Sequence, residues 1–279
     1  MNGQARRPPI EEESLGEVVQ QELEAILPLS AKLRGGIEQA GGVALLFARA
    51  AVRTLGKRFT FFDVAYQIEA LGTRSLSIAI LTATFAGLVI SVQFAFTMAR
   101  FGVQHTVGRV VVLALFRELG PTLTALTVGA RIGSGIAAEL GSMKVTEQID
   151  AVRVLGADPI AKLVVPRLLA CLIVIPALSV LADVIGLIAG AGVIRFEYAI
   201  PLNQFFQSAI ETAVLRDFTS GVGKAAVFGL IIAIVGCYKG LNAEGGTEGV
   251  GRATTETVAI SSVAVCLADF FLTKLFLTF

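Results

Sequence analysis

The chain has 279 residues, of which 54% are hydrophobic and 16% are charged. A soluble domain carries about 25% charged residues, so this composition excludes an ordinary soluble protein and indicates a chain that lies largely in lipid. Lysine and arginine number 23 against 22 aspartates and glutamates, which excludes an overall basic surface for nucleic acid. No metal site is expected, because His105 and the three cysteines share no metal-ligand spacing.

The first 74 residues contain no segment that could span a bilayer. Residues 1–34 are expected to form a cytoplasmic extension without a signal peptide, and no role is assigned to them. In the following region, 35–74, apolar residues recur at helical spacing up to about residue 55, while Arg49, Arg53 and Lys57 share another face. This pattern predicts an amphipathic helix in the membrane interface; the alternative is a helix packed on the protein's own cytoplasmic side.

Five apolar blocks then follow, and about 20 apolar residues span a bilayer. They cover about 75–99, 106–140, 163–194, 221–238 and 254–277. Arg117-Glu118 and Pro121 interrupt the second block, and Pro166 and Pro176 are expected to bend the third. The segment 196–218 is too polar to span and is expected to form a short outer helix. The sequence thus predicts an all-α membrane protein with a five-helix transmembrane domain over residues 75–279.

Five spans place the two termini on opposite sides of the membrane. Nine Lys/Arg residues flank the spans on the side of the N-terminus and five on the other side. Because positive charge is enriched in cytoplasmic loops, the N-terminus is expected in the cytoplasm and the C-terminus on the outer side.

Small residues form ridges on two predicted spans. Gly129, Gly133, Ala137 and Gly141 recur every four residues, and Gly186 and Gly190 repeat this spacing. Such ridges allow close helix packing in lipid. The packing could lie within one subunit or between two, and the pattern favours neither.

Seven charged residues fall within or at the edges of the spans, namely Arg117, Glu118, Arg131, Glu139, Asp183, Lys224 and Asp269. A charge in the bilayer is costly, so each should face protein or a wet cavity. Arg117 is expected roughly 16 Å along its helix from the outer end, near the midplane. With Glu118 and Lys224 it could form a polar cluster that holds a lipid phosphate. The alternative is an internal salt bridge that fixes helix register.

The stretch GSMKVTEQIDAVRVLGADP, residues 141–159, is short, charged and amphipathic. Thr146 is expected to cap a helix of about ten residues, over 146–155, and Gly156 and Asp158-Pro159 to end it. Ile149, Val152 and Leu155 would share one side. A cytoplasmic helix between two spans can couple them to a separate motor, although a helical loop on the lipid headgroups has the same pattern.

The run ELGPTLTALTVGARIGSGIAAELGSMKVTEQIDAVRVLGADPI, residues 118–160, closely resembles the signature region of the MlaE/YrbE permease family, and GRATTETVAISSVAV, residues 251–265, also fits it. The resemblance covers roughly residues 35–279. It implies the permease of an ABC-type lipid transporter in the inner membrane, a homodimer with five spans per subunit. Arg117, Glu118 and Lys224 match charged positions of that family's lipid cavity.

The resemblance also implies partners. A cytoplasmic ATP-binding cassette ATPase dimer would contact the coupling helix through Thr146, Glu147, Gln148, Asp150 and Arg153. An MCE-domain lipid-binding protein is expected on the outer side, often with a small STAS-domain protein on the ATPase, and the cargo would be phospholipid or a related lipid.

The sequence contains no G-x-x-x-x-G-K-[ST] motif, so ATP and Mg²⁺ are expected on the partner, and this chain is expected to hold no cofactor and to be no enzyme by itself. Two other functions stay open. A secondary carrier or channel would bind protons or cations at Glu118, Asp183 or Asp269, and a structural scaffold would transport nothing.

Overall fold

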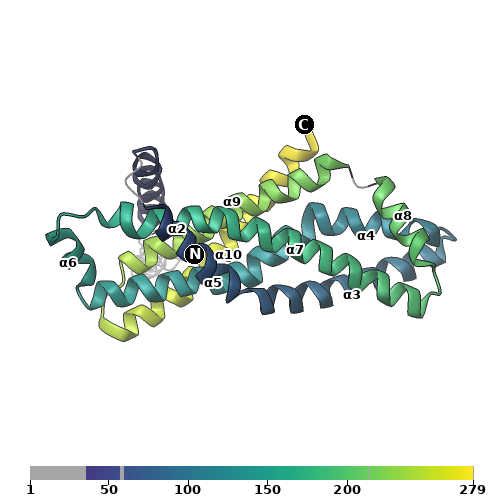
Figure 1. Cartoon of the computed structure of the whole chain (residues 1–279), viewed down its shortest axis with the longest axis horizontal. Coiled ribbons are helices and arrows are strands. Elements are labelled where there is room, and N and C mark those ends of the chain that lie inside the picture. Colours follow the sequence, from purple (N-terminus) through teal and green to yellow (C-terminus); the bar gives the residue numbers. More distant parts are fainter. Residues whose placement is uncertain (1–35, 57–59, 213, 279) are drawn as a thin grey trace, which may run out of the picture. The chain divides into compact units, whose positions relative to one another are not determined.

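The computed structural model describes residues 36–56, 60–212 and 214–278, and the regular structure in these ranges is entirely helical. The chain divides into two units, Met1–Leu45 and Leu46–Phe279. The first unit is described only over 36–45, the beginning of a helix that runs from 36 to 55. This range agrees with the predicted amphipathic helix, whose place in a membrane interface stays a prediction. The second unit holds all the helices labelled in Figure 1.

Five helical segments of the second unit are long and apolar enough to cross a membrane, which confirms the predicted number of spans. After α2 (Phe61–Thr73), the first span is α3 (Leu76–Arg100). The second combines η1 (Gln104–Thr106), α4 (Val107–Ala114), η2 (Leu115–Leu119) and α5 (Gly120–Val145). The third combines η3 (Ile160–Val164) and α7 (Val165–Glu197), and the last two are α9 (Leu215–Leu241) and α10 (Gly246–Thr278). The chain is therefore an all-α membrane protein.

The charged pair and the prolines that were expected to interrupt the spans do not break them. Arg117-Glu118 lies in η2, a five-residue π-helical turn that joins α4 to α5 without ending the span. Pro121 and Pro166 occupy the first turns of α5 and α7, and α7 continues as one helix through Pro176. Proline is best tolerated at a helix start because its missing N–H is not needed there.

Two short helices connect the spans. Figure 1 shows α6 (Gln148–Val154) where α5 ends and α7 begins, and α8 (Leu202–Thr212) beyond the other end of α7, where it packs against α4. The outer helix is shorter than the predicted segment 196–218. Residues 196–197 still belong to α7, and residues from 215 onward already belong to α9. Polar residues at the ends of long helices can remain helical, so polarity alone misplaced these boundaries.

The ridge of small residues on α5 packs within the chain, against α9 and α10. A Cβ atom at Gly133 would lie 3.1 Å from Ile232 Cγ2 and 3.3 Å from Thr257 Cγ2. At Gly141 it would lie 3.3 Å from Ala243 Cβ, and at Gly129 it would collide with the Ile232 side chain. Ala137 is fully buried. The absence of larger side chains therefore sets how closely these three helices approach.

The second ridge, on α7, packs against α3. A Cβ atom on Gly87 of α3 would lie 2.5 Å from the Cα of Gly186 and would collide with its carbonyl oxygen. One turn further, a Cβ on Gly190 would collide with the hydroxyl of Ser91. The two backbones touch along this line, which gives α3 and α7 one fixed register.

Overpacking of a well-packed core costs roughly 1–3 kcal/mol. We predict that Gly87→Leu lowers the free energy of unfolding by more than this, because the added side chain meets backbone atoms, which cannot rotate away. The measurement is thermal unfolding in detergent. Gly192→Leu is the matched control, since a Cβ at Gly192 of α7 has no atom within 4 Å. Equal losses of melting temperature in the two variants would contradict this account of α3–α7 packing.

Candidate functional site: a neutral polar cluster at the π turn

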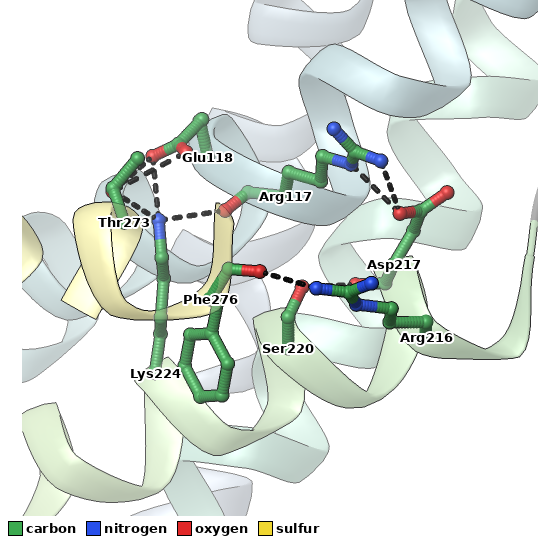
Figure 2. A pocket seen from close by; sticks show the side chains of 8 residues that line it. All are labelled: Arg117, Glu118, Arg216, Asp217, Ser220, Lys224, Thr273 and Phe276. Atoms are coloured by element: carbon green, nitrogen blue, oxygen red, sulfur yellow. Dashed lines mark hydrogen bonds and ion pairs between the residues drawn. The ribbon is translucent and has the colours of Figure 1, made fainter. Parts of the chain in front are cut away.

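Lys224 of α9 is the centre of a polar cluster between η2, α9 and α10. Its side chain is 2% exposed, and Nζ donates to Glu118 Oε2 at 2.7 Å and to the backbone carbonyl of Arg117 at 3.0 Å. The third N–H of the ammonium group has Thr273 Oγ1 of α10 at 2.7 Å as its acceptor, and Asp269 Oδ1 lies 3.0 Å from Nζ. Figure 2 shows the Lys224 side chain reaching from α9 toward Glu118 and Thr273. Every N–H of this ammonium group is used by the protein.

Arg117 points away from this group. In Figure 2 its guanidinium extends toward the start of α9, where Nε donates to Asp217 Oδ1 at 2.8 Å. The Asp217 side chain is 5% exposed, whereas the Arg117 side chain is 42% exposed. Adjacent residues of a helical turn do not face the same way, so Arg117 and Glu118 serve two different partners. The π turn thus brings the three predicted residues together, but as two separate ion pairs.

A small cavity lies beside these pairs. It has a volume of about 160 Å³ and is lined by Arg117, Glu118, Arg216, Asp217, Ser220, Lys224, Thr273 and Phe276. Arg216 donates to the backbone carbonyl of Phe276 at 3.0 Å, and the Thr273 hydroxyl lies 3.3 Å from Glu118. Sites that hold small organic ligands have volumes of roughly 300–1,000 Å³, so this cavity of one chain is too small for a lipid.

The charges of the cluster balance. Arg117, Arg216 and Lys224 face Glu118, Asp217 and Asp269, so three positive groups meet three negative ones. A phosphate could gain Arg117 only in competition with Asp217. Within one chain the cluster therefore has the character of an internal salt-bridge network that fixes helix register. A lipid bound at this cluster would need contacts with residues other than those that line the cavity.

Sequence reasoning missed part of this cluster, although the spacing held the signal. Asp217 and Lys224 are seven residues apart, and Asp269 and Thr273 are four apart, so each pair shares one helix face. The sequence identifies Asp269 as a charge within a span, but it does not predict the pairing of Asp269 with Lys224. Testing each charged residue of the spans for polar neighbours at i+4 and i+7 would have found both pairs.

Three other charges of the spans lie outside this cluster. Glu139 of α5 pairs with Arg167 of α7 at 2.8 Å, and Arg131 donates to Ser75 Oγ at 3.0 Å. Asp183 of α7 is 4% exposed, and none of the described residues donates a hydrogen bond to its Oδ1. This oxygen lies against Gly120, where a Cβ atom would collide with it.

The short helix α6 differs in detail from the prediction. Thr146 is not its cap, because its hydroxyl donates to Ser142 O at 2.8 Å and closes the end of α5. The chain turns at Glu147, whose φ of 59° is rare for a residue other than glycine, and α6 begins at Gln148. Gly156, with φ 78°, follows its end as predicted. The start of α6 depends on the left-handed conformation of Glu147, which a residue other than glycine rarely adopts. The prediction from sequence therefore placed the cap at the wrong residue.

The faces of α6 are likewise only partly as predicted. Ile149 is 1% exposed, but Val154 and Leu155 are 87% and 84% exposed. Asp150 accepts from Arg153 at 2.8 Å and lies 3.4 Å from Lys144 Nζ of α5. Gln148 donates to Thr146 Oγ1 at 3.1 Å. The turn is thus fastened to α5 by polar contacts, while its apolar tip faces outward.

We predict that Lys224→Met lowers the free energy of unfolding by about 3–5 kcal/mol, because it leaves Glu118 and Asp269 without the cation that neutralises them. Arg117→Gln should cost less, because the glutamine amide can still donate a hydrogen bond to Asp217 in place of the guanidinium. Thermal unfolding of both variants in detergent checks this order. A Lys224→Met protein as stable as the wild type would show that the network does not hold η2, α9 and α10 together.

The sequence of the chain is similar to those of known membrane transport proteins. Residues 64–275 match the family model described as Permease MlaE. A probable ABC transporter permease protein of Rickettsia typhi is 38% identical over 85% of this chain and 92% of its own length. One from Synechocystis is 42% identical over 75% of this chain and 80% of its own length. The chloroplastic protein TRIGALACTOSYLDIACYLGLYCEROL 1 of Arabidopsis thaliana is 37% identical over 84% of this chain and 67% of its own length. The chain therefore belongs to the MlaE permease family.

Proposed function

We propose that this chain is the membrane subunit of an ABC transporter that moves phospholipid or a related lipid. Family membership and the relatives named as ABC transporter permeases support the transporter class. The Arabidopsis relative carries the name of a galactolipid, which supports lipid as the cargo. The chain lacks a phosphate-binding G-x-x-x-x-G-K-[ST] loop, so ATP and Mg²⁺ belong to a separate ATPase, and this subunit contributes transport rather than hydrolysis.

The observation that carries the proposal is the structure of α6. It joins two long spans by a hydrogen-bonded turn and presents Val154 and Leu155, both strongly exposed, at its tip. Exposed apolar side chains that lie together can contact a protein or a membrane. The charged residues around this tip, Asp150 and Arg153, favour a protein. A partner that binds this tip would move the ends of α5 and α7 together. We assign five further residues to the same coupling surface: Thr146, Glu147, Gln148, Asp150 and Arg153.

Two ion pairs extend this surface toward the N-terminal helices. Lys162 Nζ lies 2.7 Å from Asp63 Oδ2 of α2, and Arg53 Nε lies 2.7 Å from Asp158 Oδ2. Both bonds join the segment just after α6 to residues that precede the first span. Movement of α6 would therefore reach α2 and the helix before it as well as the spans.

The remaining parts of the proposal follow the family. The 160 Å³ cavity is too small for a lipid, so we propose a homodimer in which a second copy supplies further walls beside Arg117, Glu118 and Lys224. We place the protein in the inner membrane, with its N-terminus and α6 cytoplasmic and its C-terminus periplasmic. An MCE-domain protein would meet the periplasmic side, and a STAS-domain protein could join the ATPase.

A proton-coupled carrier is the second candidate, because Asp183 is buried in a span without a described hydrogen-bond donor to Oδ1. A carboxyl group in that position is stable when protonated and could carry a proton. Such a carrier would transport without an ATPase.

Lipid transfer from vesicles that contain the purified complex distinguishes the two candidates. The proposal predicts transfer that requires the ATPase and ATP and is insensitive to a proton gradient. Transfer by this chain alone that follows an imposed proton gradient, and that Asp183→Asn abolishes, would favour the carrier instead.

We further predict that Val154→Ser/Leu155→Ser weakens ATPase binding about tenfold or more without lowering the melting temperature, because both side chains are exposed. Co-purification of the ATPase with the permease measures the effect. Phe196→Ser, at the other end of α7 and 90% exposed, is the matched control and should retain the ATPase. Undiminished ATPase retention by the α6 variant would remove α6 from the interface.

A further inference from the structure

A second, larger cavity lies between α2, α5 and α10, separate from the polar cluster at the π turn. This α2–α5 groove has a volume of about 550 Å³, within the range of sites that hold small organic ligands. Tyr66 and Leu71 of α2 and Arg74, which follows α2, line it together with Arg131, Ile136 and Glu139 of α5. It combines a charged rim with an apolar wall.

The groove lies at one edge of the membrane-spanning region. The first span, α3, begins at Leu76, two residues after Arg74, and Arg131 is tied to Ser75 by a 3.0 Å hydrogen bond. Both Arg74 and Arg131 therefore lie level with the first residues of α3. Arginine at the end of a span lies at the depth of the lipid headgroups. The polar cluster lies elsewhere along the same span, since Arg131 follows Arg117 by 14 residues, or about 21 Å of helix.

The charge of the groove is not balanced. Glu139 is the one carboxylate among the described residues that line it, and Glu139 is already paired with Arg167 at 2.8 Å. Within the described part of the chain, neither Arg74 nor Arg131 contacts a carboxylate, and both are exposed. This is the opposite of the polar cluster, in which Lys224 has an acceptor for every N–H and Arg117 is held by Asp217.

We propose that the α2–α5 groove binds the headgroup of an anionic phospholipid. Arg74 and Arg131 pair with the phosphate, because a guanidinium fork matches phosphate oxygens in pairs. The aromatic ring of Tyr66 lies at headgroup depth, and Leu71 and Ile136 contact the start of the acyl chains. The site goes beyond the proposed transport function, since it needs no ATPase and its occupancy is measured by binding alone.

The experiment measures lipid retained by the purified, delipidated protein in neutral detergent, by native mass spectrometry. The protein is titrated with phosphatidylglycerol or phosphatidylcholine. We expect the wild type to hold one more phosphatidylglycerol than phosphatidylcholine per chain, and Arg74→Gln/Arg131→Gln to weaken that binding about tenfold or more. Arg195→Gln, an exposed arginine of α7 outside the groove, is the matched control and should bind as the wild type does. Inorganic phosphate should not displace the lipid, because it makes no contact with the apolar wall.

A steric variant tests the same site without changing charge. A Cβ at Gly135, which lines the groove, meets no atom within 4 Å, so Gly135→Phe fills the space without disturbing the packing of the chain. We expect it to lose the extra phosphatidylglycerol, whereas Gly192→Phe, equally open but in α7, should keep it.

Three results would overturn the proposal. The first is full retention of phosphatidylglycerol by the double arginine variant or by Gly135→Phe. The second is displacement of the lipid by inorganic phosphate, which would make the groove a site for free anions. The third is a disulfide-linked dimer formed by Gly135→Cys in a Cys266→Ala background in native membranes, which would show that a second copy of the chain covers the groove.

Discussion

A positive charge inside a membrane protein must be neutralised by the protein itself, and Lys224 is where this constraint is strictest. A charged side chain at the centre of a span costs about 2.5–3.5 kcal/mol even on the mildest insertion scale. Here the ammonium group finds acceptors on η2 and α10, so three helices can meet only in the register that brings these atoms together. The π turn is part of the same solution, because it offers Arg117 O and Glu118 to Lys224 while it sends the Arg117 guanidinium to Asp217.

Two kinds of interaction hold the helices together, namely close packing at glycines and ion pairs. Glycines let α3 touch α7, and α5 touch α9, without a hydrophobic driving force between them. The ion pairs then choose among the registers that such smooth surfaces would otherwise allow. Helices joined in this way move as units, which is what the proposed coupling through α6 requires. Along the second span, Arg117 at the π turn is paired with a carboxylate, whereas Arg131, near the start of α3, has no carboxylate partner among the described residues.

The sequence predicted the broad architecture because long apolar runs have one meaning in a chain with so few charges. It located five spans, the amphipathic helix before them and the short helix between α5 and α7. It could not place the start of α6, since the turn depends on Glu147 in a left-handed conformation that residue type does not favour. It brought Arg117, Glu118 and Lys224 together, but the neutrality of their surroundings also depends on two acids that it left out of the cluster. Asp217 shares a face of α9 with Lys224, whereas Asp269 of α10 becomes a neighbour only after folding. The cluster was therefore expected to be more positive than it is.

The proposed function requires that α6 face the compartment that holds the ATPase. Labelling with a membrane-impermeant maleimide in vesicles of known sidedness tests it most directly, with one cysteine introduced at a time in a Cys266→Ala background, in which the two remaining cysteines, Cys171 and Cys237, are buried. Arg153→Cys in α6 should react only from the cytosolic surface and should be protected when the ATPase is bound. Arg195→Cys, near the other end of α7, should react only from the opposite surface. Reaction of Arg153→Cys from the outer surface would contradict the proposed orientation and the coupling mechanism with it.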